Sequence, residues 1–375
     1  MPTVTFLVPC YRLAHFLPEC VDSILGQTHA DLEVVILDDC SPDDTPAVAA
    51  RFTDPRVRYV RHPQNLGHLR NYNAGIALAR GEYVWLISAD DRLRRPYIVE
   101  RFVDLAERHP EVGFVFCPGV GLRDGRDTAV LGRARSDDPV RPGREFLHDE
   151  LLGRNLVLAA SGMVRRRLYD TLGGFPLDLP YAGDWYLWCL FSLHADVGYL
   201  PEPMVSYRDH DRSMTRILSA DGTRRLLADE FAVRWRIARV AGEAGAPAIR
   251  ARCEKALAED YARFLAGSTR GALRGDEEGP VASEQVRFTP GEVEAPARAN
   301  AWDAPTARAI LVRSCILGGD IALARGERAR AAALYAAALR ARPASLEAIS
   351  KSALLRLGRV GDALRRQIAR VRRAV

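Results

Sequence analysis

The sequence predicts an α/β protein: a doubly wound, mostly parallel sheet, followed by an all-α C-terminal region. Two observations predict this class. Over residues 3–118, short apolar runs alternate with amphipathic stretches of helical periodicity, which is typical of parallel strands joined by crossover helices. Beyond about residue 221, the apolar residues follow a helical period and are rich in Ala, Leu and Arg, which predicts helices.

The elements follow in order along the chain. We expect the first five strands at VTFLVP, LEVVIL, VRYVRH, YVWLIS and VGFVFC, with helices through Leu25, over 44–52, near 70–80 and near 96–108. Residues 119–145 lack periodicity and are rich in Gly, Asp, Arg and Pro, which predicts a long loop. A strand is then expected within 155–165, a helix from 183, and a strand with a Pro-containing turn in VGYLPEPMVSYR.

The second half divides further by composition and charge. We predict a first domain over 1–220, a helical extension over 221–270, a Gly-, Pro- and acid-rich linker over 271–305 and a helical module over 306–375. From Thr306 onward, 15 Lys and Arg accompany 4 Asp and Glu, a net charge of +11 in a chain whose total is +5. This asymmetry indicates a separate module.

The C-terminal module resembles a tetratricopeptide repeat, because small, aromatic and helix-breaking residues recur where a 34-residue helix–turn–helix repeat has them. These are Gly319, Gly326, Ala331, Tyr335, Ala338 and Pro343, with a weaker second copy at Gly358 and Ala363. The alternative is an ordinary Ala-rich helical hairpin. Repeats of this kind bind a peptide or stabilise a homodimer, and the sequence leaves both partners open.

Composition excludes several classes of protein. With 48% hydrophobic and 27% charged residues, the chain is neither disordered nor a disulfide miniprotein. Seven scattered cysteines predict reduced thiols and a cytoplasmic location, and no apolar run is long enough to span a membrane.

Arg supplies 51 of the 53 basic side chains, which favours a GC-rich bacterial source. The basic tail lacks a nucleic-acid motif, so we expect no nucleic acid and at most peripheral membrane contact.

Two acidic pairs follow predicted strands. Asp38 and Asp39 come after LEVVIL, and Asp90 and Asp91 come after YVWLIS. Because ligands bind beyond the carboxyl ends of parallel strands, both pairs point to one crevice. Adjacent carboxylates repel each other unless a cation or hydrogen-bond donors share them, and Mg²⁺ or Mn²⁺ would suit such a pair together with phosphate oxygens. A turn or helix-cap role is the alternative for the first pair.

Ordered motifs then carry a family resemblance. They are VPCY at 8–11, LDDCSPDD at 37–44, NLGH and NYNAGIALARGEYVWLISADD within 65–91, GGF at 173–175, GDWYLW at 183–188 and YRDHDRSMT at 207–215. In this order and spacing, residues 1–220 resemble a family-2 inverting glycosyltransferase of the GT-A fold. The resemblance implies a nucleotide-diphosphate sugar donor, an acceptor of unknown identity and a Mn²⁺ or Mg²⁺ cofactor.

The resemblance also implies roles for residues around the donor. Pro9 and Tyr11 would line the base pocket, Asp39 would bind base or ribose, and Asp90 and Asp91 would bind ribose and metal. Ser88 stands where the family often has the first acid of Asp-x-Asp.

Further roles concern the charges around the diphosphate. Tyr72 stands where the family often has an Arg, whose charge Arg70 would supply. Arg208 and His210 would close over the diphosphate, although a solvated turn is the alternative there.

Asp184 occupies the position of the family's catalytic base. An inverting transfer needs one carboxylate to take the proton of the attacking hydroxyl, and no second carboxylate as nucleophile. An N-cap role before WYLWCLF is compatible with this, and we expect Trp185 and Trp188 to pack in the core.

Two rival functions differ in testable ways. A nucleotide-sugar pyrophosphorylase would need a Gly-rich basic loop after the first strand, which VPCYRLAHFL lacks. A catalytically inactive glycosyltransferase-like scaffold, acting through its repeat module, is favoured by Ser88 and opposed by Asp90, Asp91 and Asp184.

Overall fold

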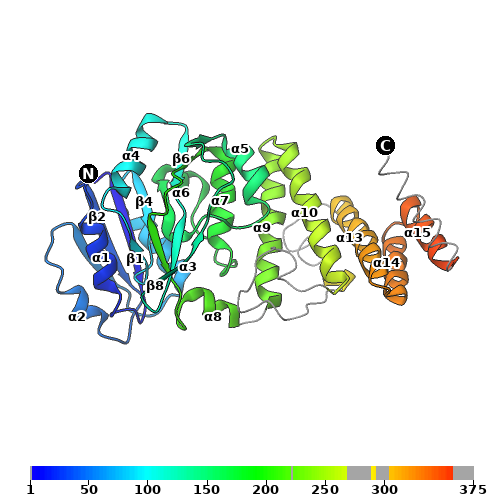
Figure 1. The fold of residues 1–375 in the computed structure, drawn as a ribbon, viewed down its shortest axis with the longest axis horizontal. Coiled ribbons are helices and arrows are strands. Elements are labelled where there is room, and N and C mark those ends of the chain that lie inside the picture. The colour runs from blue at the N-terminus through cyan, green and yellow to red at the C-terminus, as the bar shows by residue number, and fades with distance from the viewer. Residues whose placement is uncertain (1, 221–222, 268–288, 293–303, 358–375) are drawn as a thin grey trace. The chain divides into compact units, whose positions relative to one another are not determined.

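The computed structural model describes residues 2–220, 223–267, 289–292 and 304–357. The chain forms two compact units, Met1–Ala220 and Asp221–Val375, here called the N-terminal and the C-terminal unit (Figure 1). Each unit is described by itself.

An eight-stranded sheet organises the N-terminal unit. Its first four strands in spatial order are parallel, and the fifth is antiparallel to both of its neighbours. The predicted doubly wound, mostly parallel sheet is therefore confirmed. The order is β3 (Val57–Arg61), β2 (Leu32–Asp38), β1 (Val4–Cys10), β4 (Tyr83–Leu86), β10 (Gly162–Arg165), β6 (Val112–Phe116), β11 (Asp196–Tyr199) and β9 (Val140–Arg141).

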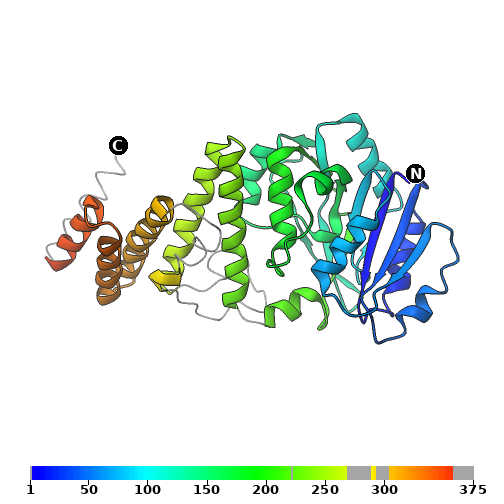
Figure 2. The same ribbon diagram turned by 180° about the vertical axis from the view of Figure 1, so that it is seen from behind.

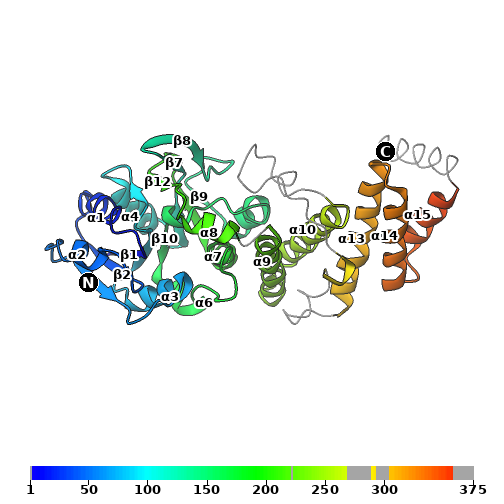
Figure 3. The same ribbon diagram turned by 90° about the horizontal axis from the view of Figure 1, so that it is seen from below.

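Helices cover both faces of this sheet. Figure 3 shows α1 (Leu17–Leu25) and α4 (Ile98–Arg108) on one face, and α3 (His68–Leu78) and α6 (Arg166–Leu172) on the other. Successive strand residues point to opposite faces, so Phe6 joins the cluster beneath α1 and α4. Leu7 instead faces Gly75 of α3, where a Cβ would lie 2.3 Å from the Leu37 side chain. Only glycine permits so close an approach.

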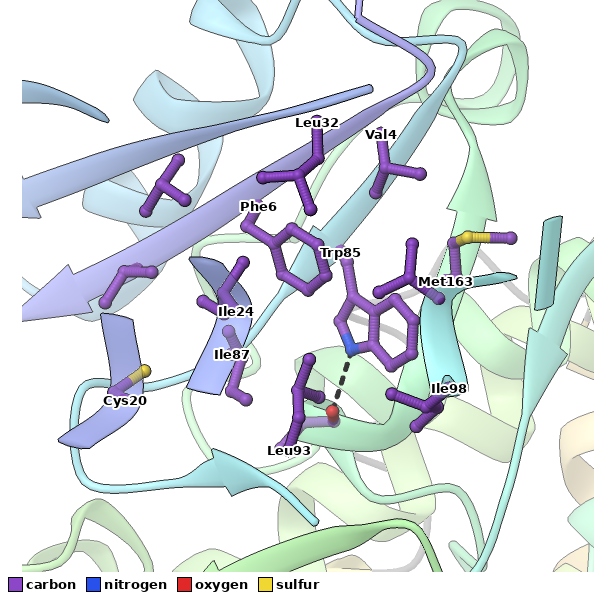
Figure 4. Packing of buried hydrophobic residues seen from close by; sticks show 14 of the residues in the cluster. Val4, Phe6, Cys20, Ile24, Leu32, Trp85, Ile87, Leu93, Ile98 and Met163 are labelled. Atoms are coloured by element: carbon purple, nitrogen blue, oxygen red, sulfur yellow. Dashed lines mark hydrogen bonds between the residues drawn. The ribbon is translucent and has the colours of Figure 1, made fainter. Parts of the chain in front are cut away.

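Aromatic rings fill the core on the α1 and α4 side (Figure 4). Trp85 stacks between Phe6 and Phe102, with ring centroids 5.3 and 4.7 Å apart. The indole N–H of Trp85 donates to the Ala160 carbonyl at 2.8 Å, so its polar atom is satisfied within the apolar cluster. This packing holds β4, and with it the chain that continues to Asp90, in a defined position.

The long loop predicted for 119–145 is wrong, because the first half of this segment is a β-hairpin. Strands β7 (Gly119–Arg123) and β8 (Arg126–Leu131) meet at Asp124 and Gly125, whose φ angles are 50° and 74°. An Asp-Gly pair with two positive φ angles is the preferred two-residue hairpin turn. The hairpin belongs to a second sheet of order β5-β12-β7-β8, with β5 at Arg92–Leu93 and β12 at Val205–Arg208.

Other elements of the N-terminal unit complete the fold. The strand expected within 155–165 is shorter, since β10 begins only at Gly162 after a 3₁₀ turn at Ala159–Ser161. The predicted burial of Trp185 and Trp188 is confirmed, at 2% and 4% exposed. The remaining helices are α2 (Thr45–Ala49), α5 (Gly143–Phe146), a π-helical turn at Leu147–Leu151, α7 (Gly183–His194) and α8 (Met214–Ala220).

The described part of the C-terminal unit is helical, as predicted. Figures 1 and 2 show α9 (Thr223–Glu243) and α10 (Pro247–Leu265) side by side, followed by α13 (Ala304–Ala324), α14 (Arg328–Ala341) and α15 (Leu346–Arg356). One apolar cluster contains Phe231, Tyr261, Cys315 and Leu334. Helices from the predicted extension and from the predicted module therefore share one hydrophobic core.

Helices α13 and α14 pack as a hairpin. Gly319 lies against the Tyr335 ring, which a Cβ would approach to 2.4 Å, and Gly326 turns the chain at a φ of 80°. Ala331, Tyr335 and Ala338 are fully buried. The tetratricopeptide identity stays a prediction, and Gly358, Ala363 and most of the predicted linker lie outside the described residues. Within those residues, no helix is both long and apolar enough to cross a membrane.

Candidate active site

A pocket of about 150 Å³ lies beyond the carboxyl end of β4. Three of the predicted carboxylates line it: Asp90, Asp91 and Asp184. The rest of the wall combines aromatic, hydroxyl and apolar side chains, among them Tyr72, Tyr181, Tyr207, Ser88, Ser213, Thr215, Phe175, Met214 and Leu218. Residues distant in sequence are thus brought together around one small cavity with acidic groups in its wall.

Backbone pairing places the Asp90–Asp91 pair. After β4, the N–H of Ile87 donates to Leu7 and that of Ala89 donates to Pro9, so the chain continues alongside β1. The Asp91 N–H then donates to the Ser88 carbonyl at 2.9 Å, which closes a turn. The two residues are only 7% and 6% exposed, and burying two neighbouring carboxylates is costly without compensating charge.

One oxygen of Asp90 is paired and the other is not. Asp90 Oδ2 lies 2.9 Å from His210 Nε2. Because His210 Nδ1 accepts the Arg212 N–H at 3.3 Å, the ring proton belongs on Nε2, which donates to Asp90. Asp90 Oδ1 is buried and has no hydrogen-bond partner among the described residues. A buried carboxylate oxygen without a partner is suited to a cation.

Asp91 feels the charge of its neighbour. Burial, and then the charge of Asp90, raise the pKa of Asp91 well above its usual value, while the Arg208 N–H, which donates to Asp91 Oδ1 at 2.8 Å, lowers it. A divalent ion would relieve this repulsion. Over the described part of the chain, no group of three or more His, Cys, Asp and Glu side chains could enclose a metal ion, so other ligands would have to complete its coordination.

The Arg208 side chain is held by contacts that the sequence did not reveal. Its Nε donates to the Asp90 carbonyl at 2.7 Å and its Nη2 to Glu19 Oε2 at 2.5 Å. The guanidinium lies 4.5 Å above the Phe16 ring, a cation–π distance. Glu19 lies in the first turn of α1. In the sequence, only its position after the first predicted strand indicated that it could lie near the site.

Asp184 stands apart from the acidic pair in sequence, in the first turn of α7. Its Oδ1 accepts the Trp185 N–H at 2.7 Å, and its Oδ2 accepts an amide N–H of Asn155 at 3.1 Å. Burial raises the pKa of Asp184 to about 6, and these two donors oppose the shift. A carboxylate with this pKa is mostly ionised at neutral pH and is a stronger base than an exposed aspartate.

Two tyrosines lie near all three carboxylates. Burial raises the pKa of Tyr72 and of Tyr207, and the negative charges of Asp90, Asp91 and Asp184 raise it further. The Tyr207 hydroxyl is 2.7 Å from Thr215 Oγ1 at the start of α8. Tyr72 was singled out in the sequence only as the replacement of an Arg, and Tyr207 stood in the motif YRDHDRSMT without a role of its own.

The first acidic pair serves the local fold. Asp38 is fully buried, accepts the Ser41 N–H at 2.7 Å and pairs with Arg61 at 2.8 Å, so it has the alternative, turn-forming role. Asp39 Oδ1 and Oδ2 accept the N–H groups of Leu66 and Gly67 at 2.7 and 3.0 Å. Each Asp39 oxygen keeps a second lone pair for a ligand.

Five predicted residues lie outside the pocket wall: Asp39 and His210, whose contacts are given above, and Pro9, Tyr11 and Arg70. Pro9 is buried on β1, and Tyr11 is 40% exposed just beyond it, with the Arg12 guanidinium 5.3 Å from its ring. Arg70 is exposed on α3 and does not line the pocket. Because two residues span about 200° around a helix, Arg70 points away when Tyr72 points inward. The structure does not bring the Arg70 charge to the place of the missing family Arg.

Comparison with known proteins agrees with this architecture. Residues 5–170 match the model of Glycosyl transferase family 2. An uncharacterized protein of Mycobacterium tuberculosis is 30% identical over 241 residues, which cover 60% of this chain and 71% of that protein. The uncharacterized glycosyltransferase EpsJ of Bacillus subtilis is 33% identical over 230 residues, 58% of this chain and 64% of EpsJ.

A solved structure shows the same fold. S. aureus TarS 1–349, crystallised in complex with UDP-GlcNAc, is 17% identical, with a TM-score of 0.58 over 98% of this chain and 92% of that one. Family model and relatives agree: residues 5–170 form a glycosyl transferase family 2 domain, and the chain is a glycosyltransferase.

Proposed function

We propose that the chain transfers a sugar from a nucleotide-diphosphate donor to an acceptor nucleophile, with inversion at the anomeric carbon and with a divalent cation. One observation carries the proposal. A single pocket is lined by the Asp90–Asp91 pair and by a separate carboxylate, Asp184, whose pKa is raised to about 6. The pair suits a cation and diphosphate, and the separate carboxylate suits a general base.

Asp184 would act on the acceptor. As the acceptor oxygen attacks the anomeric carbon, its proton passes to a carboxylate oxygen of Asp184. The bond from that carbon to the diphosphate oxygen breaks, and the departing nucleoside diphosphate takes the electron pair. One displacement inverts the centre. Among the described residues lining the pocket, the other acids are the Asp90–Asp91 pair, so no separate carboxylate is left to act as a nucleophile for a retaining reaction.

The residues present fit a divalent ion, Mn²⁺ or Mg²⁺. Asp90 Oδ1 is buried without a partner, and Asp91 adds a second carboxylate in the same wall. These two side chains would hold the ion, with phosphate oxygens and water completing its ligands. When bound, the ion would supply positive charge to balance the diphosphate.

The remaining predicted residues would bind the nucleotide. Tyr11 is exposed just beyond β1. The segment that leads to Asp90 lies beside β1, because the Ala89 N–H donates to the Pro9 carbonyl. Base and ribose would lie here, with Asp39 accepting from one of them. Arg208 uses Nε and one N–H of Nη2 to bind Asp90 and Glu19, so its other N–H groups would donate to phosphate. His210 would hold Asp90 in position.

The first experiment identifies the donor. UDP-GlcNAc heads the panel, because TarS was crystallised with it, and other UDP-, GDP- and dTDP-sugars follow. We expect one donor to raise the thermal midpoint in the presence of Mn²⁺ and to lose this effect with EDTA. A donor that stabilises the protein equally in EDTA would contradict the metal assignment.

The second experiment tests the base. Asp184→Asn should lower the transfer rate by about 10²–10⁴-fold, the usual contribution of a general base, while donor affinity by calorimetry stays unchanged. Asp127→Asn is the matched control. Asp127 lies on the exposed strand β8, forms an ion pair with Arg94 and does not line the pocket. Near wild-type transfer by Asp184→Asn would overturn the assignment and indicate that another group is the base, whereas a wild-type chain that transfers no sugar would favour an inactive scaffold.

For the C-terminal unit, we propose that the α13–α14 hairpin is a tetratricopeptide-like element that binds a peptide or a second copy of the chain. The close contact of Gly319 with Tyr335 and the burial of Ala331 and Ala338 support this. Sedimentation of the full chain at increasing concentration distinguishes a homodimer from a peptide-binding monomer.

A further inference from the structure

A loop residue outside the predicted set contacts the candidate base. Asn155 lies between the π-helical turn at Leu147–Leu151 and the 3₁₀ turn at Ala159–Ser161. It does not line the pocket. Its side chain nevertheless reaches Asp184, 29 positions later in the sequence, at 3.1 Å. The contact therefore comes from the tertiary fold and has no counterpart in a local motif.

The chemistry of the contact determines the orientation of the amide. An ionised carboxylate only accepts hydrogen bonds, so Nδ2 rather than Oδ1 of Asn155 must face Asp184. The Trp185 N–H occupies the other carboxylate oxygen at 2.7 Å. Each oxygen of Asp184 thus receives one of these two donors, which come from different elements.

The other end of the same amide is unsatisfied. Asn155 Oδ1 is buried and has no hydrogen-bond partner among the described residues. A buried acceptor without a donor disfavours the folded state. The contact that Asn155 does make is the one to Asp184, which identifies what this side chain contributes.

We propose that Asn155 is the positioning residue of Asp184: its Nδ2–H fixes one carboxylate oxygen, as the Trp185 N–H fixes the other, and so holds the base against the pocket. This inference rests on the proposed role of Asp184 as the base. By donating to the ionised form, Asn155 also keeps the base deprotonated at neutral pH. It touches neither donor nor acceptor.

Other groups near Asp184 remain the same when Asn155 is changed. The Tyr72 and Tyr207 hydroxyls feel the Asp184 charge, and Asp90, Asp91 and Arg208 line the same pocket. A change confined to Asn155 therefore isolates the contribution of one donor.

The test is a pH titration of the Asp184 carboxyl in the full chain. Aspartate labelled with ¹³C at the carboxyl reports ionisation by NMR, and the signal that disappears in Asp184→Asn identifies residue 184. Asn155→Leu keeps the volume and excludes water but removes the donor. Asn155→Asp keeps the shape and adds a second carboxylate. Asn65→Leu is the control, since Asn65 bonds the backbone of Asp39 and Gly67 instead.

We expect the wild-type midpoint near 6 and a midpoint higher by roughly one pH unit in Asn155→Leu, the effect of losing one hydrogen bond to a charged group. Asn155→Asp should raise the midpoint further, because two adjacent carboxylates repel, and Asn65→Leu should leave it unchanged. An unchanged midpoint in both Asn155 variants overturns the proposal. The titration needs no substrate, so its failure is distinct from that of the base assignment, which the transfer rate of Asp184→Asn decides.

Discussion

Replacing Asp184 by Asn should stabilise the N-terminal unit at neutral pH while it abolishes efficient transfer. In the fold, burial raises the pKa of Asp184 from 3.8 to about 6. Each pH unit of such a difference corresponds to about 1.36 kcal/mol, so the ionised side chain disfavours folding by about 3 kcal/mol. An Asn amide has no charge to bury, but it can accept only one of the two N–H bonds now made. We therefore expect a net gain of about 1–3 kcal/mol.

The sign of the pH dependence follows from the two pKa values. Because the folded pKa lies above the unfolded one, the contribution of Asp184 to stability is fully present below about pH 3.8 and is lost as the pH rises to about 6. Asn does not titrate. The advantage of Asp184→Asn should therefore be largest at pH 7–8 and should shrink as the pH falls toward 4.

Thermal unfolding at pH 4 and pH 8 measures this directly. For a unit of this size, 1 kcal/mol corresponds to about 2–4 °C, so the midpoint at pH 8 should rise by roughly 2–12 °C. Asp127→Asn, at an exposed ion pair, should shift the midpoint little at pH 8. The reasoning about burial would be refuted if the Asp184→Asn protein had a lower thermal midpoint than wild type at pH 8. It would also be refuted if the variant's midpoint exceeded that of wild type by the same amount at pH 4 and at pH 8.

Three further expectations follow from the contacts. Asp90→Asn and Asp91→Asn should each weaken Mn²⁺-dependent donor binding, measured by calorimetry, because both carboxylates line the pocket; unchanged binding in both would exclude them as ligands. Asp39→Ala should lower the free energy of unfolding by about 2–4 kcal/mol in urea, since it leaves the Leu66 and Gly67 N–H groups without their acceptor; a change below 1 kcal/mol would contradict this. A chain ending at residue 220 should retain donor affinity, and loss of that affinity in a folded 1–220 chain would contradict the separation of the two units. A chain ending at residue 270 should bind more of an apolar dye than the full chain, because the truncation exposes the face of α10 that contains Tyr261.

Much of the architecture was predictable from local signals. Alternating apolar and amphipathic runs indicated the parallel strands and their helices, because each strand must bury both faces beneath helices. Once YVWLIS was identified as a parallel strand, the acidic pair that follows it was placed at the carboxyl end of the strand, where ligands bind. Asp90 and Asp91 do line the pocket. Asp184 was found through an ordered set of motifs, since one carboxylate before an apolar helix carries no functional signal alone.

The errors and omissions arose where distant contacts decide. The Asp124–Gly125 turn was overlooked within a polar stretch, and β7 beside it is stabilised by pairing with β12, where Gly119 is paired with Val205. Arg70 seemed able to replace a charge at position 72, but the helical angle between the two positions directs it away from the pocket.

Apart from the β7–β8 hairpin, sequence alone determined which segments become the main strands and helices, and which acids follow strand ends, because these properties depend on neighbours in the chain. Tertiary structure decided what each carboxylate does. It gave the two oxygens of Asp39 to Leu66 and Gly67, left Asp90 Oδ1 without a partner and placed Asn155 beside Asp184. Each of these hydrogen bonds joins residues that are 27–29 positions apart in the sequence, and burial strengthens each of them. The chemistry of the site therefore depends on distances that only the folded chain sets.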